Sequence, residues 1–308
     1  MPNGVPVATP IYGREIEESF DWMNGIVYGD FGVGKTFLAG SAIFVPDMRD
    51  ILYIALEGGE KGLREIAKLC RKKGIDPNTH MLVIPVENYK QYAYIYEFIK
   101  LHIQFRDNND EINLRKLEGQ IRRVVNGVTI TTDMLNDPKA MEQLIPVPKK
   151  FRTVITDSLT EAQKYCMYQI LGINPLTQKI DAEPDSAQWG DWGKSREMIQ
   201  FLVRRYRDIP MHSWFICGRD IEQDNFKKFH YYPLLPGKLA DDVRGLVDIV
   251  GYYDKIPQEG GTVVRRLYLE GGFYGGAYIA AKHRFGTALK GLWIDNPTMQ
   301  VLYDLDNA

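Results

Sequence analysis

Residues 29–36 read GDFGVGKT and fit the pattern G-x-x-x-x-G-K-[ST]. The glycines of such a run let the backbone turn tightly, so that several N–H groups point at one anion. Lys35 would then reach the β- and γ-phosphates of ATP, and the Thr36 hydroxyl would bind Mg2+. The pattern therefore predicts a nucleotide-binding loop made of Gly29, Asp30, Phe31, Gly32, Val33, Gly34, Lys35, Thr36 and Phe37.

Two acidic residues follow short apolar runs and can complete this site. Asp157, after VIT, is the second candidate for holding magnesium, and the alternative is that it caps the next helix together with Ser158. Glu57 follows ILYIAL and is the candidate base that activates water. The alternative for Glu57 is an acid favoured by the dipole at a helix N-terminus.

These side chains can meet only if the strands that carry them end at one edge of a sheet, where ligands bind in open α/β folds. Short apolar runs predict strands at 23–28, 51–56, 81–86, 151–158, 212–218 and 248–254. Helical patterns occupy 35–44, 57–75, 89–105, 194–209 and 238–247. This alternation predicts a mostly parallel sheet flanked by helices, followed by antiparallel strands at 265–286.

Polar segments interrupt the alternation. Residues 1–20 are rich in Pro and Gly, then acidic, and are expected to form an N-terminal arm. Residues 106–150 are expected to be an insertion with some helix and a hairpin around VNGVTITT. The stretches 172–193 and 219–237 are expected to be long loops.

Composition limits the classes of protein that the chain can belong to. Its 308 residues suit one large domain or two small ones, and a net charge of −2 means that any anionic partner needs a local basic patch. The three cysteines have no metal-like or disulfide-like spacing, which indicates a reducing cytoplasm. No apolar run approaches the roughly 18 residues of a membrane span, and no signal peptide is recognisable. We expect a cytoplasmic protein with no membrane partner.

In their order along the chain, these motifs resemble the core of the RecA recombinases. The resemblance is strongest to the phage RecA-like single-strand annealing ATPases known as the Sak group. It is carried by GDFGVGKT, LYIALEGGEKGLRE, VITDSLTEA, WGDWGKSREMIQFL, PLLPGKLADDVRGLVDIVGY and AAKHRFG. A T-D-S segment with Glu57 on another strand matches RecA-type ATPases rather than the AAA+ or ABC arrangement. The resemblance implies an α/β, RecA-like P-loop NTPase core over 21–308, a DNA-dependent ATPase.

The segment AAKHRFG contains Lys282 and Arg284, which we expect to alternate along a strand and leave it on one face. RecA-type proteins place two such cations on the γ-phosphate of a neighbouring subunit. The resemblance thus implies that Lys282 and Arg284 act in trans, like an arginine finger, within a filament or ring. The alternative is a solvated basic face on an edge strand.

In RecA-type proteins, the loops after the metal-binding strand and after the next strand line a DNA channel. The resemblance therefore places single-stranded DNA against 172–193 and 219–237. Cations would hold phosphates while aromatic faces stack bases. The alternative is that the aromatic residues anchor the loops to the core. The candidate DNA contacts are Trp189, Trp192, Arg219, Phe226, Lys227, Lys228, Phe229, His230, Tyr231, Gly237 and Lys238.

The chain departs from the RecA pattern in two places. An amide side chain that senses the γ-phosphate is replaced by Gly218-Arg219-Asp220, and Arg219 is a candidate for that sensing role. The insertion has no RecA counterpart. Its cations Arg115, Lys116, Arg122 and Arg123 either extend a basic path or belong to a charged, solvated helix.

The sequence thus favours an ATP- and Mg2+-dependent protein that binds single-stranded DNA, assembles with itself and promotes annealing or strand exchange, with a single-strand-binding protein as a further partner. If a phage encodes it, its place is the bacterial host cytoplasm. One alternative is a RecA-fold helicase or helicase loader. Others are a P-loop small-molecule kinase and a module that keeps ATP as a structural ligand.

Overall fold

The structure is a computed structural model and describes residues 22–125, 127–177 and 186–308. The expected arm at 1–20 lies outside the described residues, as does part of the expected loop at 172–193. Within the described part, no helix is long and apolar enough to cross a bilayer.

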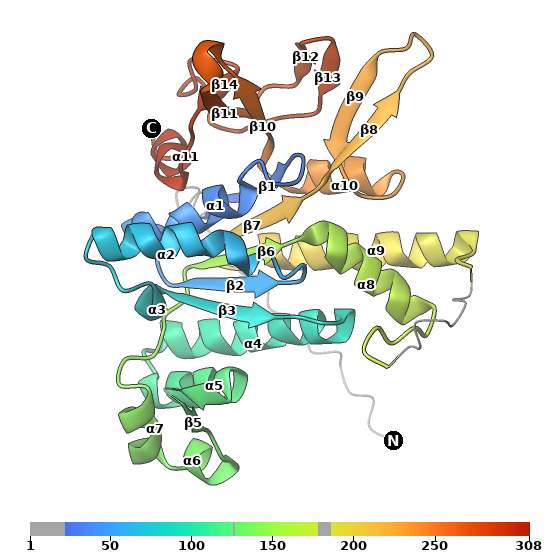
Figure 1. Ribbon diagram of the computed structural model, residues 1–308. Coiled ribbons are helices and arrows are strands. Elements are labelled where there is room, and N and C mark those ends of the chain that lie inside the picture. Colours follow the sequence, from blue (N-terminus) through green and yellow to red (C-terminus); the bar gives the residue numbers. More distant parts are fainter. Residues whose placement is uncertain (1–21, 126, 178–185) are drawn as a thin grey trace, which may run out of the picture.

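The main sheet has the strand order β14-β11-β10-β1-β7-β6-β2-β3. Neighbours from β10 to β3 run parallel, whereas β11 and β14 are antiparallel additions (Figure 1). The strands are β1 (Asn24–Tyr28), β2 (Ile51–Ala55), β3 (Met81–Pro85), β6 (Thr153–Asp157), β7 (His212–Cys217), β10 (Ile249–Pro257), β11 (Val263–Tyr268) and β14 (Trp293–Asp295). The expected fold class, a mostly parallel sheet with C-terminal antiparallel strands, is confirmed.

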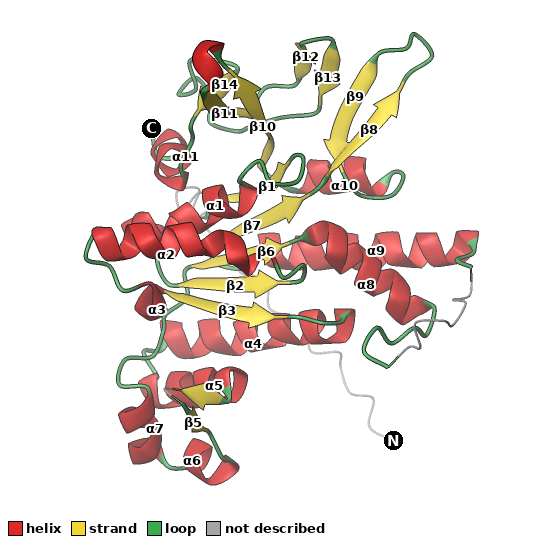
Figure 2. Cartoon of the chain, in the orientation of Figure 1, coloured by secondary structure: helices red, strands yellow, loops and turns green. Residues whose placement is uncertain are grey.

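Helices cover both faces of this sheet (Figure 2). Successive strand residues point to opposite faces, so Ile26 packs in one core cluster and Val27 in the other. The cluster of Ile26 is covered by α4 (Tyr89–Asp107), α8 (Leu159–Ile170), α9 (Trp189–Arg207) and α10 (Leu239–Leu246). The cluster of Val27 is covered by α1 (Lys35–Gly40), α2 (Leu63–Lys72) and α11 (Met299–Asp306).

Short helical turns connect several of these elements. They are the α-helical turn α3 (Pro77–His80) and the 3-10 turns η2 (Ser41–Phe44), η3 (Pro46–Met48), η4 (Gly59–Gly62) and η5 (Glu259–Gly261). The helix expected at 35–44 is therefore α-helical in its first half and 3-10 in its second.

Register brings the strand ends that carry the candidate site to one edge. Ala55 of β2 is paired with Asp157 of β6, which is paired with Ile216 of β7. On the other side of β7, Cys217 is paired with Tyr28, the last residue before the glycine loop. Because these strands are parallel, their carboxyl ends form a single edge of the sheet.

The expected insertion contains α5 (Glu111–Arg122), the strand pair β4 (Val124–Val125) and β5 (Val128–Thr129), α6 (Thr132–Asn136) and α7 (Pro138–Leu144). The hairpin expected around VNGVTITT is present. This segment lies away from the main sheet beside α4 (Figure 1), and Val125, Met141 and Ile145 form a small core of its own.

Three cations of this segment, Arg115, Lys116 and Arg122, make contacts within the protein. Arg115 donates to the carbonyls of Ile145 and Pro146, and Lys116 donates to Asn136. Arg122 pairs with Glu118, which is buried. These contacts favour a structural role for the three side chains over a basic path.

The expectation of a loop over the whole of 219–237 is wrong. Most of this stretch is a hairpin of β8 (Arg219–Gln223) and β9 (Phe229–Pro233), which projects beyond the main sheet in Figure 1. β9 also pairs with β13 (Ala277–Ile279), which pairs with β12 (Gly272–Tyr274), so a second sheet forms. The partner strand lies far away in the sequence, where no local pattern reveals it.

Helix α9 begins at Trp189 and not at Lys194 as expected, because a capping box precedes it. The Asp191 carboxylate accepts a hydrogen bond from the Gln188 backbone N–H at 3.1 Å. Trp189 and Trp192 therefore lie in the first helical turn rather than in a loop. Gly190 and Gly193, which have low helix propensity, are the reason that the sequence predicts a loop here.

Candidate active site

The glycine loop joins β1 to α1 in a shape that only glycine allows at several positions. Gly32 and Gly34 have φ angles of 71° and 108°, in the left-handed region. A Cβ on Gly29 would lie 2.1 Å from the carbonyl oxygen of Tyr253, so no side chain fits there. The loop is therefore shaped by its own glycines and by β10, which passes beside it.

Lys35 begins α1, and its ammonium group lies at the mouth of the loop. The Nζ atom donates to the carbonyl oxygens of Gly29 at 2.9 Å and Asp30 at 2.8 Å. Burial lowers the pKa of Lys35, while the nearby Cys217 and Asp157 act in the opposite direction. A phosphate oxygen would offer this cation a charged partner in place of two neutral carbonyls.

Thr36 and Asp157 meet as the magnesium hypothesis requires. The Thr36 Oγ1 atom donates to the Asp157 Oδ2 atom at 2.7 Å, and the Tyr53 hydroxyl donates to the same oxygen. A hydroxyl and a carboxylate, both oxygen donors, suit Mg2+ held jointly with substrate phosphates. The described residues contain no cluster of three or more His, Cys, Asp or Glu that could hold a metal alone.

The helix-capping alternative for Asp157 is not supported. The N-cap of α8 is Ser158, whose hydroxyl oxygen accepts from the Glu161 backbone N–H at 3.3 Å. The Asp157 carboxylate, only 4% exposed, points instead towards Thr36.

Glu57 lies immediately after β2 beside the same site. The Ser158 hydroxyl donates to its carboxylate, and burial raises the pKa of Glu57. A pocket of about 690 Å³ adjoins it, lined among others by Phe31, Glu87 and Lys164. An exposed carboxylate that lies next to the phosphate loop and lines open space has the placement of a general base.

Arg219, the first residue of β8, reaches the glycine loop. Its Nη2 atom is 2.7 Å from Asp30 Oδ2, its Nη1 atom donates to the Tyr252 hydroxyl at 3.1 Å, and its guanidinium lies 4.8 Å from the centre of the Tyr231 ring. This position fits the sensing role considered for Arg219 and not that of a DNA contact. No local signal revealed the pairing, because 189 residues separate Arg219 from Asp30.

The expectation that Lys282 and Arg284 alternate along a strand is wrong, because no strand covers 282–284. Lys282 forms one isolated bridge with Val250, and the side chain of Phe285 is buried in the core and holds the segment against it. Arg284 Nη1 lies 2.6 Å from Asp248 Oδ1.

The ion pair of Arg284 lies at the amino edge of the sheet. Asp248 directly precedes β10, and its backbone N–H donates to the side chain of Asn24, the first residue of β1, at 3.0 Å. The glycine loop follows the other end of β1, so Arg284 and the loop of its own subunit lie at opposite edges.

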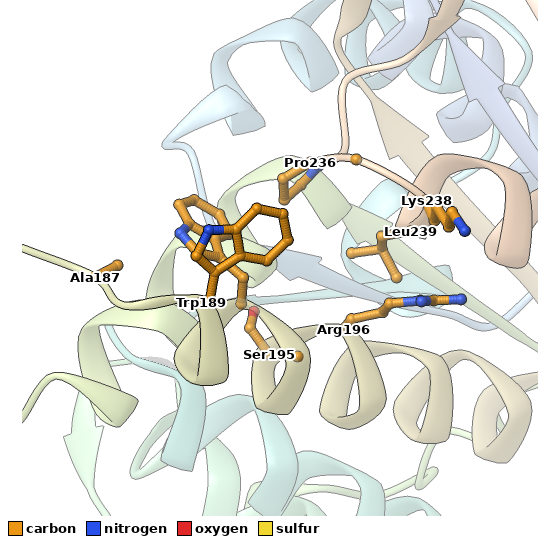
Figure 3. Close-up of a pocket in the computed structure, with 10 residues that line it drawn as sticks. Ala187, Trp189, Ser195, Arg196, Pro236, Lys238 and Leu239 are labelled. Atoms are coloured by element: carbon orange, nitrogen blue, oxygen red, sulfur yellow. The ribbon is translucent and has the colours of Figure 1, made fainter.

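Candidate DNA contacts from the two expected loops converge in a pocket of about 700 Å³. Figure 3 shows Trp189 of α9 facing Pro236 and Leu239 across it, with Arg196 and Lys238 also in the lining. The indole of Trp189 is 94% exposed. The remaining lining residues are Ala187, Trp192, Gly193, Ser195 and Gly237.

The other candidates, on the hairpin, divide into two groups. Tyr231 and His230 are partly buried and contact other residues of the protein: Tyr231 lies 5.5 Å from the ring of Tyr252, and His230 bonds to Asp224 at 3.0 Å. This matches the anchoring alternative for these two residues.

The tip of the hairpin is exposed. Phe226 is 84% exposed and Phe229 is 47% exposed, and Lys227, with φ of 61°, sits in the turn between the strands. Lys228 lies over the ring of Phe273 at 4.9 Å. Phe226, Phe229 and Lys227 are therefore available to a partner.

Two residues of the site were missed from the sequence. The sequence predicts Tyr53 only as part of a buried strand and Ser158 only as part of a helix cap. The Tyr53 hydroxyl contacts Asp157, and the Ser158 hydroxyl contacts Glu57. In each pair, the two residues lie more than 100 positions apart in the sequence.

Comparison with known proteins found one family and several solved structures that are similar to this chain. A family described as an AAA domain matches residues 23–284. The RadB recombinase is 15% identical with a TM-score of 0.41, over 89% of this chain and 86% of that one. An ATPase from the type III secretion system of pathogenic bacteria is 14% identical with a TM-score of 0.33, over 77% of this chain and 54% of that one. No curated protein matches the sequence. The chain belongs to the AAA domain family and is a P-loop ATPase.

Proposed function

We propose that this ATPase binds single-stranded DNA and uses it in annealing or strand exchange. The observation that carries the proposal is the pocket in which Trp189 and Trp192 meet Arg196, Gly237 and Lys238. Exposed indoles stack bases of any sequence, and neighbouring cations hold the phosphates between them. The exposed tip of the β8–β9 hairpin would extend this surface.

Each residue at the phosphate site has a role in hydrolysis. Lys35 neutralises charge on the transferred phosphate. Thr36 and Asp157 would hold Mg2+, which would supply further positive charge to the phosphates. Glu57 accepts a proton from the attacking water, with Ser158 fixing its carboxylate. Arg219 joins the glycine loop to the base of the hairpin, so a change at the phosphates has a direct route to the DNA surface.

Lys282 and Arg284 are proposed to act on the nucleotide of a neighbouring subunit. Strand β1 lies between the amino edge of the sheet and the glycine loop, and it is about 13 Å long. This distance disfavours action of Lys282 and Arg284 on the nucleotide of their own subunit. To act in trans, Arg284 must leave Asp248. Head-to-tail contacts of this kind generate rings or filaments.

The test is the rate of ATP hydrolysis with and without a single-stranded oligonucleotide, across a series of salt concentrations. Binding through phosphates predicts that stimulation by DNA falls as salt rises. A rate indifferent to DNA at every salt concentration would overturn the proposal. Free phosphate as the product would also exclude a small-molecule kinase, and unwinding of a forked duplex would identify a helicase.

A further inference from the structure

A second arginine touches the glycine loop from β11. The Arg265 Nε atom donates to the carbonyl oxygen of Val33 at 3.1 Å. The side chain can lie close because residue 34 is glycine: a Cβ there would be 3.1 Å from the same nitrogen. The contact joins parts of the chain 232 residues apart and belongs to none of the motifs recognised in the sequence.

The backbone of Arg265 is fixed by two hydrogen bonds to Asn296, which follows β14. Its N–H donates to the Asn296 side-chain oxygen at 3.1 Å, and its carbonyl accepts from the Asn296 N–H at 2.5 Å. β11 is itself held between β10 and β14. The guanidinium is therefore presented to the loop by a rigid strand.

The orientation of one peptide follows from this contact. In a planar trans peptide, the carbonyl and the N–H point in opposite directions. Because the Val33 carbonyl points to Arg265, the Gly34 N–H points away from that arginine. In loops of this type, backbone N–H groups cradle the phosphates. Gly34, at a φ of 108°, has more conformational freedom than any other residue type would have there, so an external restraint has much to contribute.

The neighbouring Arg266 makes different contacts from those of Arg265. Side chains alternate along a strand, and Arg266 makes two hydrogen bonds to Asp295, at 2.7 and 2.9 Å, while stacking on Trp293. Among the described residues, Arg265 has no ion pair. Its charge is therefore not neutralised by a carboxylate, and it stands at the rim of an anion site.

We propose that Arg265 is a positioning residue of the phosphate loop: it holds the Val33–Gly34 peptide so that the Gly34 N–H faces the phosphate chain, and it adds a cation at the rim. The proposal rests on the nucleotide site and is independent of DNA binding and of the action in trans.

The experiment measures equilibrium binding of MgADP and of magnesium pyrophosphate by calorimetry. Arg265→Gln should weaken both ligands about tenfold, since a hydrogen bond from a charged donor is lost. Arg265→Lys, which can still donate to the Val33 carbonyl, should recover part of that loss. Arg266→Gln is the matched control and should bind like the unmodified protein.

The outcomes separate this proposal from that of the nucleotide site as a whole. If the unmodified protein binds neither ligand, the assignment of the nucleotide site is wrong. If it binds but Arg265→Gln changes the affinity less than twofold, or no more than Arg266→Gln does, Arg265 has no positioning role. Weakening of ADP with unchanged pyrophosphate would assign Arg265 to the nucleoside and overturn the proposal. Thermal melting of the unliganded variants checks that they fold. If Arg265→Gln does not fold, the affinities of Arg265→Lys and Arg266→Lys for the same two ligands are compared instead.

Discussion

The phosphate site and the proposed DNA surface are built in different ways. At the phosphate site, Asp157 is 4% exposed and tied to two hydroxyl donors, and Lys35 is held by two carbonyls. At the DNA surface, Trp189 is 94% exposed, and none of the hydrogen bonds of the described residues involves its indole. One region is ordered before its ligand arrives, whereas the other offers separate side chains to a partner.

This difference predicts how each region responds to substitution. Buried charges in a shared network depend on each other, so removing one disables the rest. Exposed aromatic and basic side chains contribute separately and modestly, and salt weakens the charged ones.

The largest effect is expected for Lys35→Ala. The substitution removes the cation that faces the transferred phosphate, so hydrolysis should fall by about 10³-fold or more. Phosphate release measures the rate, and thermal melting of the unliganded protein should change little. Lys68→Ala, at an exposed lysine paired with Glu65, is the control. Turnover retained by Lys35→Ala would remove the assignment of the site.

Glu57→Gln is expected to cost about 10²- to 10³-fold in turnover while leaving MgATP binding nearly unchanged. A base must be deprotonated, and burial raises the pKa of Glu57. The rate of the unmodified protein should therefore fall with decreasing pH already above the ordinary glutamate range. A pH–rate profile of single turnovers checks this.

The same acidic limb should be missing from the profile of Glu57→Gln. Glu87→Gln, in the same pocket, should keep both the rate and the limb. An acidic limb that persists in Glu57→Gln would mean that another group is the base.

An intermediate effect is expected at the subunit boundary. Arg284→Ala and Glu57→Gln should each be inactive alone, yet mixing them should restore activity at about one quarter of the interfaces, where both intact residues meet. Hydrolysis measured against mixing ratio checks this, and no recovery at any ratio would argue against action in trans. Asp248→Asn, which frees Arg284 from its ion pair, should lower the protein concentration needed for activity.

The smallest effect is expected at the DNA surface. Replacing both Trp189 and Trp192 by Ala should weaken single-stranded DNA binding about tenfold, because base stacking is lost. The salt dependence should stay the same, whereas Lys238→Ala should make it shallower. Fluorescence anisotropy with a labelled oligonucleotide measures both. Tyr94→Ala, an exposed aromatic on α4, is the control, and an equal loss there would mean that the pocket is not the binding site.

The order of the strands and the phosphate loop could be predicted because their signals are local. An apolar run followed by glycines and a lysine describes a strand, a turn and a helix start within a few residues. The placement of Asp157 and Glu57 at one edge of the sheet could be predicted as well, since parallel strands end at the same edge and each acid lies at the end of an apolar run.

Loops were expected at the start of α9 and at the hairpin of β8 and β9, and a different set of hydrogen bonds made each expectation wrong. At α9, the cap formed by Gln188 and Asp191 outweighed two glycines of low helix propensity. At the hairpin, β9 gains its second partner from β13, about 50 residues further along the chain. In both places, hydrogen bonds outweighed the composition on which the expectation of a loop was based.

The sequence by itself determined the chemistry of the phosphate site, because the glycines, the lysine and the carboxylates each carry their meaning in type and immediate context. Only the tertiary structure decided which distant side chains attend that site. Tyr53 on Asp157 joins two strands of the main sheet, and Arg219 on Asp30 and Arg265 on Val33 each join a strand to the glycine loop. Such contacts depend on strand order and register, which are set by the burial of whole strands and leave no mark on the individual residues that meet.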